Sequence, residues 1–349
     1  MSQTNFRLFF LENVLDFLWR QWSCLVVAGG ARQEDTWIID LEALLIFSLR
    51  MSRFEPRLFD EILDWLVING KFIDIQRLRA LLRDKDDQTQ RLMSAAACLV
   101  SREAKTYQRK WQPLSLLKRG DSNVKDEMLF ITKEGQPYPT PKAESIIFHD
   151  YGFLREELLL RKMSRQVSVN TLGNIRFLLR SLFGIGSRAE CVLYLLTHEA
   201  GHPAEVAEAI GISVRGTQDA LIELAESGLV LTRIKGKRKI EYWLSQKKWW
   251  EFLGSQTFND MSLPVWVNWI AVFNALSGVW DVLEQIEVSG TSDYMKSSKL
   301  HEAMEKYIGR ELSNSGIDIT PLPLVKAGIS IEEYTKRFEE FIKKVLGNK

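Results

Sequence analysis

Cysteine is scarce in this sequence. Cys24, Cys98 and Cys191 are the only cysteines among 349 residues, and each lies far from the others in an apolar context. Three distant cysteines supply neither a disulfide framework nor a CxxC metal pair. We therefore expect buried thiols in a reducing compartment. The start, MSQTNFRLFF, has no basic n-region and no signal cleavage site, so we expect a cytoplasmic protein.

An excess of charge of either sign is also missing. The 46 basic and 45 acidic residues leave a formal net charge of +1, in a composition (46% hydrophobic, 26% charged) that is typical of globular proteins. A chain so close to neutral has no general attraction to nucleic acid, so any nucleic-acid surface must be local. The length of 349 residues predicts two or three domains.

Long apolar runs are missing too. The segment 263–279 is the one candidate, but it has 17 residues and includes Pro264 and Asn268. A membrane span requires about 20 apolar residues with interfacial anchors. We expect no membrane contact and a buried helix instead, in a core or at a dimer interface. Four aromatic residues between 266 and 280 lie along this apolar helix and favour core packing, with a small-molecule pocket as the alternative: Trp266, Trp269, Phe273 and Trp280.

Enzyme motifs are absent, with one exception. The sequence has no Walker loop, no G-x-G-x-x-G after a strand and no G-x-S-x-G. His198-Glu199-x-x-His202 matches the zinc-protease pattern, which requires both imidazoles one turn apart on a continuous helix. Gly201 before His202 and Pro203 after it both indicate that the helix ends before the second histidine. We therefore expect His198 at a helix end, His202 in a loop, and no metal, other cofactor or catalysis, with a zinc metalloprotease as the alternative.

Helical spacing of apolar residues dominates the chain, so we expect a mainly α-helical protein. Alternate prolines in GQPYPTPK force extended backbone and mark a boundary. The expected divisions are an N-terminal helical domain, a linker, a central domain and a C-terminal helical region for dimerisation, an effector or a protein partner: 1–119, 120–149, 150–254 and 255–349. A helix is expected at 150–163.

Three features of the N-terminal region leave alternatives open. The order helix, helix, strand, helix at 38–83 fits a degenerate second helix-turn-helix or, as we prefer, a small all-α interaction domain. Residues 102–119 hold six basic side chains and one acidic, with Tyr107 and Trp111 between them. Such a run is usually a solvated helix face, and an auxiliary nucleic-acid contact is the alternative. The carboxylates of FDEILDW are typical of the polar face of an amphipathic helix.

The stretch 187–244 is the most informative part of the chain. Its apolar spacing predicts a helix at 188–198, a second at 203–210 and a third that begins after Ser213 and ends at Gly228. Two β-rich segments follow with a basic, glycine-containing turn between them: 229–234, 240–244 and 235–239. Three short helices and a basic hairpin are the order of a winged helix-turn-helix.

Here the residues resemble a known family. GISVRGTQDALIELAESGLV resembles the second half of winged-helix transcriptional regulators of the MarR and ArsR type, within about 60 of the 349 residues. In that family the third helix lies in the major groove, and the hairpin, called the wing, touches the backbone or the minor groove. The resemblance implies a bacterial-type, sequence-specific regulator that binds double-stranded DNA. By position it places one set of residues nearest the bases and another nearest the phosphates: Ser213, Val214, Arg215, Thr217 and Gln218, and then Lys235, Lys237, Arg238 and Lys239.

The third helix departs from the family pattern. Asp219 stands where a basic residue is common, and residues 214–226 carry one basic and three acidic side chains. Ile222 stands where the family shows solvent a polar residue, so we expect another part of the protein to cover it. The wing compensates, because residues 233–248 hold seven basic groups and one acidic, and phosphate neutralisation supplies most non-specific affinity. A winged helix that binds only protein, as an adaptor, is the alternative.

A single winged helix contacts only a few base pairs. Two-fold pairing doubles the contact and matches palindromic sites, so we expect a homodimer. The apolar helix at 263–286 is the first candidate for the interface, since it has little polar surface to face water.

Overall fold

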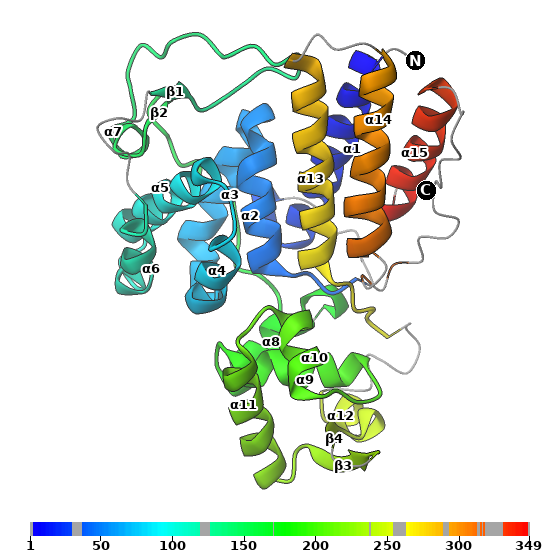
Figure 1. Cartoon of the computed structure of the whole chain (residues 1–349). Coiled ribbons are helices and arrows are strands. Elements are labelled where there is room, and N and C mark those ends of the chain that lie inside the picture. The colour runs from blue at the N-terminus through cyan, green and yellow to red at the C-terminus, as the bar shows by residue number, and fades with distance from the viewer. Residues whose placement is uncertain are drawn as a thin grey trace.

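The structure is a computed structural model that describes residues 3–29, 37–118, 126–169, 171–236, 239–253, 263–288, 293–312, 315, 317 and 331–347. Within these residues the fold is mainly helical, as the apolar spacing predicts. Figure 1 shows a larger helical part above a smaller one. We call the larger part the helical body (the described residues of 3–169 and 263–347) and the smaller part the small unit (those of 171–253).

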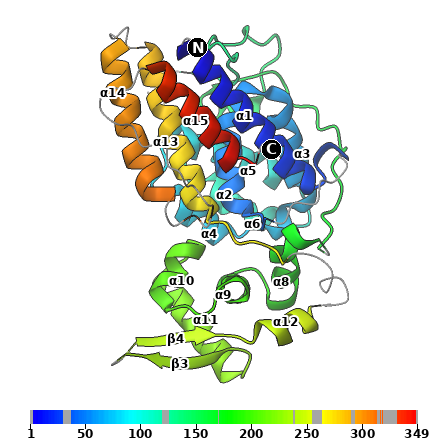
Figure 2. The same ribbon diagram turned by 90° about the vertical axis from the view of Figure 1, so that its right-hand side faces the viewer.

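The helical body unites the two ends of the chain in one hydrophobic core. Its helices are α1 (Gln3–Cys24), α2 (Leu41–Met51), α3 (Pro56–Asn69), α4 (Ile75–Leu82), α5 (Asp87–Glu103), α6 (Gln108–Ser115), α7 (Ile146–His149), α13 (Trp269–Val288), α14 (Asp293–Ala303), the π-helix η6 (Met304–Glu311) and α15 (Ile331–Val345). Figures 1 and 2 show the C-terminal helices beside α1 and α2. The regions that we expected as separate N- and C-terminal parts therefore bury their apolar faces against each other.

The N-terminal part of this body is all-α. The strand expected within 71–75 is a 3₁₀ turn (Gly70–Phe72) followed directly by α4, whose N-cap Asp74 accepts hydrogen bonds from the N–H groups of Gln76 and Arg77. The order at 38–83 is therefore helix, helix, 3₁₀ turn and helix, with no strand among its residues. The all-α alternative at 38–83 fits the structure, although its helices belong to the common core and not to a domain of their own.

The apolar segment near 263–286 contains α13. This helix begins at Trp269, where the Asn268 side chain accepts a hydrogen bond from the Ala271 N–H at 3.2 Å. Trp269, Phe273 and Trp280 are at most 4% exposed, so their expected role in the core is confirmed. The ring of Phe273 stacks on Phe47 of α2 with centroids 4.7 Å apart. Because this face is buried within the same chain, α13 was the wrong candidate for a dimer interface.

No helix in the described part of the chain combines the length and the hydrophobicity that crossing a membrane requires. None of the three cysteines belongs to a disulfide. Cys191 is fully buried, whereas Cys24 and Cys98 are only partly buried. Burial raises the pKa of the Cys191 thiol to about 12, so this group stays protonated at neutral pH.

The segment 126–169 is packed against the body. Its strands β1 (Glu127–Met128) and β2 (Phe153–Leu154) pair in parallel, and Leu129 and Phe148 are fully buried, so the described part of the expected linker is not a free connection. The helix expected at 150–163 is wrong: beyond β2 the chain lacks regular structure up to residue 168.

Carboxylates of α3 hold this irregular segment in place. Asp64 accepts hydrogen bonds from the N–H groups of Lys162 and Ser164 at 2.8 and 3.1 Å, and Asp60 pairs with Arg155 at 2.6 Å. Backbone without its own helix or sheet bonds requires such partners when it is buried. Asp64 is 2% exposed. The polar face expected for FDEILDW therefore binds chain instead of water.

The small unit has a second hydrophobic core. Its elements are α8 (Ile175–Phe183), α9 (Ser187–Thr197), α10 (Pro203–Ile210), α11 (Val214–Glu226), the antiparallel strands β3 (Leu231–Lys235) and β4 (Lys239–Trp243), and α12 (Gln246–Phe252). The expected bounds of the second helix are confirmed, and those of the first and third lie within a residue or two. Proline at the first helical position and a serine N-cap are local signals, so the sequence alone locates these ends.

A buried network of charges joins the small unit to the body. Its members are at most 4% exposed, and they come from both parts: Asp40, Glu42 and Arg77 from the body, and Arg176, Arg180 and Glu190 from the small unit. The Nε of Arg77 also donates to the carbonyl of Ile210, at the end of α10, at 2.6 Å. The orientation of α10 and the turn after it is thereby fixed to α4.

Candidate nucleic-acid interface

The turn between α10 and α11 fixes the first turn of α11. Gly211 has a φ of 66°, the left-handed conformation that ends helices and favours glycine. Ser213 has extended backbone, and its hydroxyl accepts a hydrogen bond from the Gly216 N–H at 3.2 Å. This N-cap satisfies one of the free N–H groups of α11, as the sequence predicts.

Most of the residues expected nearest the bases are exposed on α11. Ser213, Val214, Arg215 and Gln218 all face solvent, and the side chain of Arg215 is 94% exposed. The N-terminal turn of a helix also carries a partial positive charge, which favours an anionic partner. This end of α11 is therefore the most accessible part of the expected contact surface.

Thr217 is a correction to that set. It is 0% exposed and lies on the face of α11 that packs into the core, with Ala220, Leu221 and Leu224. These positions recur at helical spacing, so a residue at 217 points inward when the other three are apolar. Thr217 therefore cannot reach a base.

Ile222 is the second correction. We expected another part of the protein to cover it, but it is 39% exposed. The surface around it is not basic: Arg215 lies 4.0 Å from Asp219, and Arg188 pairs with Glu223 at 2.6 Å. The face of α11 thus offers one exposed guanidinium at its N-terminal end and mainly acidic groups further along.

The hairpin is tied to the loop after α9. Gly201 exchanges two backbone hydrogen bonds with Tyr242 of β4, both at 2.9 Å. A Cβ atom on Gly201 would lie 2.5 Å from Val206 Cγ2 and 2.9 Å from Tyr194 Cε1, so only glycine allows this approach. The hairpin is thereby held against α9 and α10.

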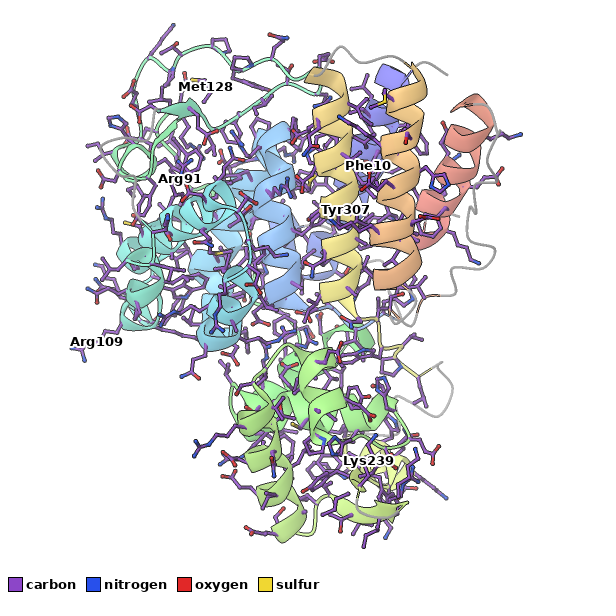
Figure 3. All side chains as sticks on the ribbon, in the orientation of Figure 1. Phe10, Arg91, Arg109, Met128, Lys239 and Tyr307 are labelled. Carbon is purple, nitrogen blue, oxygen red and sulfur yellow. The ribbon has the colours of Figure 1, made fainter. Side chains whose placement is uncertain are left out.

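The described basic side chains of the hairpin, Arg233, Lys235 and Lys239, are exposed and ion-paired. Lys239, labelled in Figure 3, contacts Glu205 of α10 at 2.6 Å, and Lys235 contacts Glu241 at 3.0 Å. The hydrogen bond to Glu205 raises the pKa of Lys239, which keeps it charged. Arg233 pairs similarly with Glu199 and Glu241. The expected phosphate-contacting residues Lys237 and Arg238 lie outside the described residues.

The sequence alone did not reveal these carboxylate partners. Glu241 faces Arg233 directly across the hairpin, and this pairing follows once the strand register is known. Glu199 lies in the loop after α9 and Glu205 lies in α10, and the hairpin packs on both. Each is 34 residues from its basic partner in the sequence. The pairs with Glu205 and Glu199 are exposed on both sides and therefore weak, so a phosphate can replace these two carboxylates.

The H-E-x-x-H motif has the arrangement that its glycine and proline predict. α9 ends at Thr197, and His198 follows as its C-cap, with its ring stacked on Tyr194 at a centroid distance of 3.9 Å. His202 is the N-cap of α10, and its Nδ1 accepts a hydrogen bond from the Ala204 N–H at 3.3 Å. The two imidazoles belong to different helix ends. Among the described residues, no group of three or more histidine, cysteine, aspartate or glutamate side chains is arranged to hold a metal ion.

The described part of the basic run, 102–118, covers the end of α5, all of α6 and the residues beside them. Arg102, Lys105 and Arg109 are exposed, and Figures 1 and 3 place Arg109 at the edge of the body on the side where α11 lies. Lys110 is more buried and donates to the Lys71 carbonyl at 2.5 Å, and burial lowers its pKa to about 8. A solvated face and an auxiliary nucleic-acid contact both remain consistent with these positions.

We compared the chain with protein-family models, with curated proteins and with solved structures, and found no match in any of the three comparisons. Its function is therefore inferred from the geometry and the chemistry of its own residues.

Proposed function

We propose that the small unit is a winged helix-turn-helix, with β3 and β4 as the wing, and that the protein is a sequence-specific DNA-binding transcriptional regulator. The order of α9, α10, α11 and an antiparallel hairpin supports this proposal, because it is the order of winged-helix domains. The hydrogen-bonded cap and the exposed first turn of α11 support it further.

In this proposal α11 enters the major groove of double-stranded DNA, which is wide enough for a helix. Val214, Arg215 and Gln218 then lie nearest the base edges, with Ser213 at the adjoining backbone. Lys235 and Lys239 exchange their carboxylate partners for phosphates, and Lys237 and Arg238, which lie between them in the sequence, add further positive charge. Phosphate contacts supply affinity, and the contacts of α11 supply sequence discrimination.

Arg215 carries the proposal. Its guanidinium is the one basic group of α11 and is 94% exposed, at the end of the helix that a recognition helix presents to bases. Bidentate contact between arginine and guanine is the commonest specific contact in the major groove and contributes about 1–3 kcal/mol of discrimination.

The test is selection of binding sequences from random duplex DNA, followed by fluorescence anisotropy with the selected duplex. Arg215→Ala is expected to lower affinity for the selected duplex by about tenfold or more and to leave binding to random DNA nearly unchanged. Lys306→Ala, which removes a charge from the exposed surface of η6, is the matched control and should change neither. Failure to enrich any sequence, with no salt-dependent binding to random DNA, would contradict the proposal.

A protein-interaction adaptor is the second candidate, because the hairpin also exposes apolar side chains. Ile234 and Ile240 face each other across the strands and are 76% and 48% exposed. Ile222 on α11 is also exposed, and exposed apolar side chains are what protein partners contact. If Ile234→Ser abolished a partner interaction in a protein that binds no DNA, the adaptor would be the better explanation.

A further inference from the structure

A groove lies at the junction of the small unit and the helical body. Its volume is about 660 Å³. One wall comes from the end of α9 and from α10, and the other from the segment that leads into α13. The lining residues that matter here are Tyr194, His198, Glu205, Glu208, Pro264 and Trp266.

Three aromatic rings form a corner in this groove. The rings of Tyr194 and His198 are parallel, with centroids 3.9 Å apart. The Trp266 ring stands nearly perpendicular to both, at 5.8 Å from Tyr194 and 5.6 Å from His198. Unlike the aromatic residues of α13, Trp266 is only partly buried. The corner therefore presents the electron-rich faces and edges of rings to whatever occupies the groove.

The polar groups of the groove are complementary to a cation. Glu205 and Glu208 line it from α10, and Glu208 has no ion pair among the described residues. Burial lowers the pKa of His198, so its ring is neutral at pH 7 and does not repel a positive charge. Tyr194 is 9% exposed, and its hydroxyl has no hydrogen-bond partner within the described part of the chain, which leaves it available to a ligand.

We propose that this groove binds a small organic cation, an ammonium group with an apolar part. The rings attract the cation through their quadrupoles, Glu208 and Glu205 provide the counter-charge, and Pro264 with the Trp266 ring contacts the apolar part. An anion is excluded by the two carboxylates. A neutral ligand of the same shape loses both attractive contributions.

The groove contacts both the hairpin and the buried charge network. Glu205 is also the partner of Lys239 in β4, so a cation that pairs with Glu205 releases this lysine of the hairpin. The Arg176 guanidinium of the buried network lies 5.9 Å from the Trp266 ring centroid. The site is therefore placed to act as an effector site, although ligand binding itself does not depend on the proposed DNA binding.

Isothermal titration calorimetry of the full chain tests the proposal with three probes at constant ionic strength. These are choline, its neutral isostere 3,3-dimethyl-1-butanol, and benzyltrimethylammonium. The two cations should bind with millimolar or tighter dissociation constants, benzyltrimethylammonium the tighter, and the neutral isostere at least fivefold more weakly than choline.

Two variants assign the binding to the groove. Trp266→Leu should weaken benzyltrimethylammonium about fivefold or more, and Glu208→Gln, a change at an exposed position that does not threaten folding, about threefold. Glu226→Gln, which removes an exposed carboxylate at the far end of α11, is the matched control and should have no effect. Equal binding of choline and its neutral isostere, cation binding unchanged by Glu208→Gln, or no saturable binding of either cation in the millimolar range would each overturn the proposal.

Discussion

The guanidinium of Arg180 donates hydrogen bonds to both carboxylate oxygens of Glu42, at 2.7 and 2.8 Å, and so joins α8 to the first turn of α2. It also donates to Glu190 of α9 at 2.6 and 3.0 Å. Both carboxylates are 0% exposed. Three more buried groups complete the network: Asp40, Arg77 and Arg176. Its three guanidinium groups and three carboxylates balance in charge.

A buried charge is costly unless it is paired, so these groups select one arrangement of the small unit on the body. Burial alone would raise the pKa of Asp40, but the guanidinium groups of Arg176 and Arg77 outweigh it and hold that pKa well below its usual range. The same opposition lowers the pKa of Glu42 to about 2. The carboxylates of Asp40 and Glu42 are therefore ionised at neutral pH.

The first prediction concerns the loss of one partner. Arg180→Met should lower the free energy of unfolding by about 3–5 kcal/mol, because Glu42 and Glu190 then remain buried without their shared cation. Urea unfolding followed by circular dichroism measures the change. Arg215→Met, at a position whose side chain is 94% exposed, is the matched control and should shift stability by less than about 0.5 kcal/mol. Equal stability of the two variants would contradict the role of the network.

The second prediction concerns acid. Glu42 has an ordinary pKa of 4.5 and a folded-state pKa of about 2, so the folded chain binds fewer protons than the unfolded chain between these values. Its contribution, about 3 kcal/mol, is present above pH 4.5 and is lost as the pH falls toward 2. Glu42→Gln should therefore be less stable at pH 7 but lose less stability on acidification. Urea titrations from pH 7 to pH 3 check this, with Glu251→Gln on the exposed surface of α12 as the control.

How far the sequence predicts the structure depends on how many residues separate the interacting groups along the chain. Pro203 and Ser213 act on their own helix ends, and the ends of α10 and the start of α11 are predicted correctly. Glu42 and Arg180 are 138 residues apart, and no local pattern pairs them. The same holds for α13: its partners in the core are distant in the sequence, so its apolar surface alone resembles that of an interface helix.

The proposed contact surface shows the same division. The hydroxyl cap of Ser213 was predictable because it bonds three residues along the chain. The spacing of Thr217 to Leu221 and Leu224 predicts its inward position, whereas the positional match to the family places it near the bases. The pairing of Lys239 with Glu205 depends on how the hairpin packs against α10, which only the structure shows.

The third prediction separates Thr217 from its neighbour. The buried Thr217 hydroxyl has no hydrogen-bond partner among the described residues, so Thr217→Val, which keeps the shape, should raise the free energy of unfolding by about 1 kcal/mol. It should leave DNA affinity unchanged. Gln218→Ala, one position along on the exposed face, should leave stability unchanged and relax sequence preference. Loss of DNA affinity in a well-folded Thr217→Val would return Thr217 to the contact surface.

The fourth prediction is that the protein is a homodimer on DNA. Sedimentation with a selected duplex should show two chains of 40.3 kDa per duplex, and the selected sequence should be palindromic. Because α13 is internal, Trp269→Glu should unfold the chain and not yield a folded monomer. One chain per duplex on a non-palindromic sequence would show that a single small unit suffices.

The fifth prediction tests the ion pairs of the wing. Glu205→Gln removes the partner of Lys239, and glutamine keeps the hydrogen bond to the His202 N–H that completes the capping box of α10. The released ammonium should add about one phosphate contact, so affinity for random DNA should rise several-fold at low salt and the logarithmic salt slope should steepen by about 0.9. Fluorescence anisotropy between 50 and 200 mM salt measures both.

The change in net charge alone should not steepen the salt slope, and a control variant tests this. Glu251→Gln changes the net charge by the same amount on α12, where the carboxylate has no ion pair among the described residues. It should leave the slope as it is. If Lys239→Ala in the Glu205→Gln background restored the original slope, the extra contact would belong to this lysine. If both glutamine variants behaved alike, the hairpin would not lie on DNA, and its exposed Ile234 and Ile240 would then favour a protein partner.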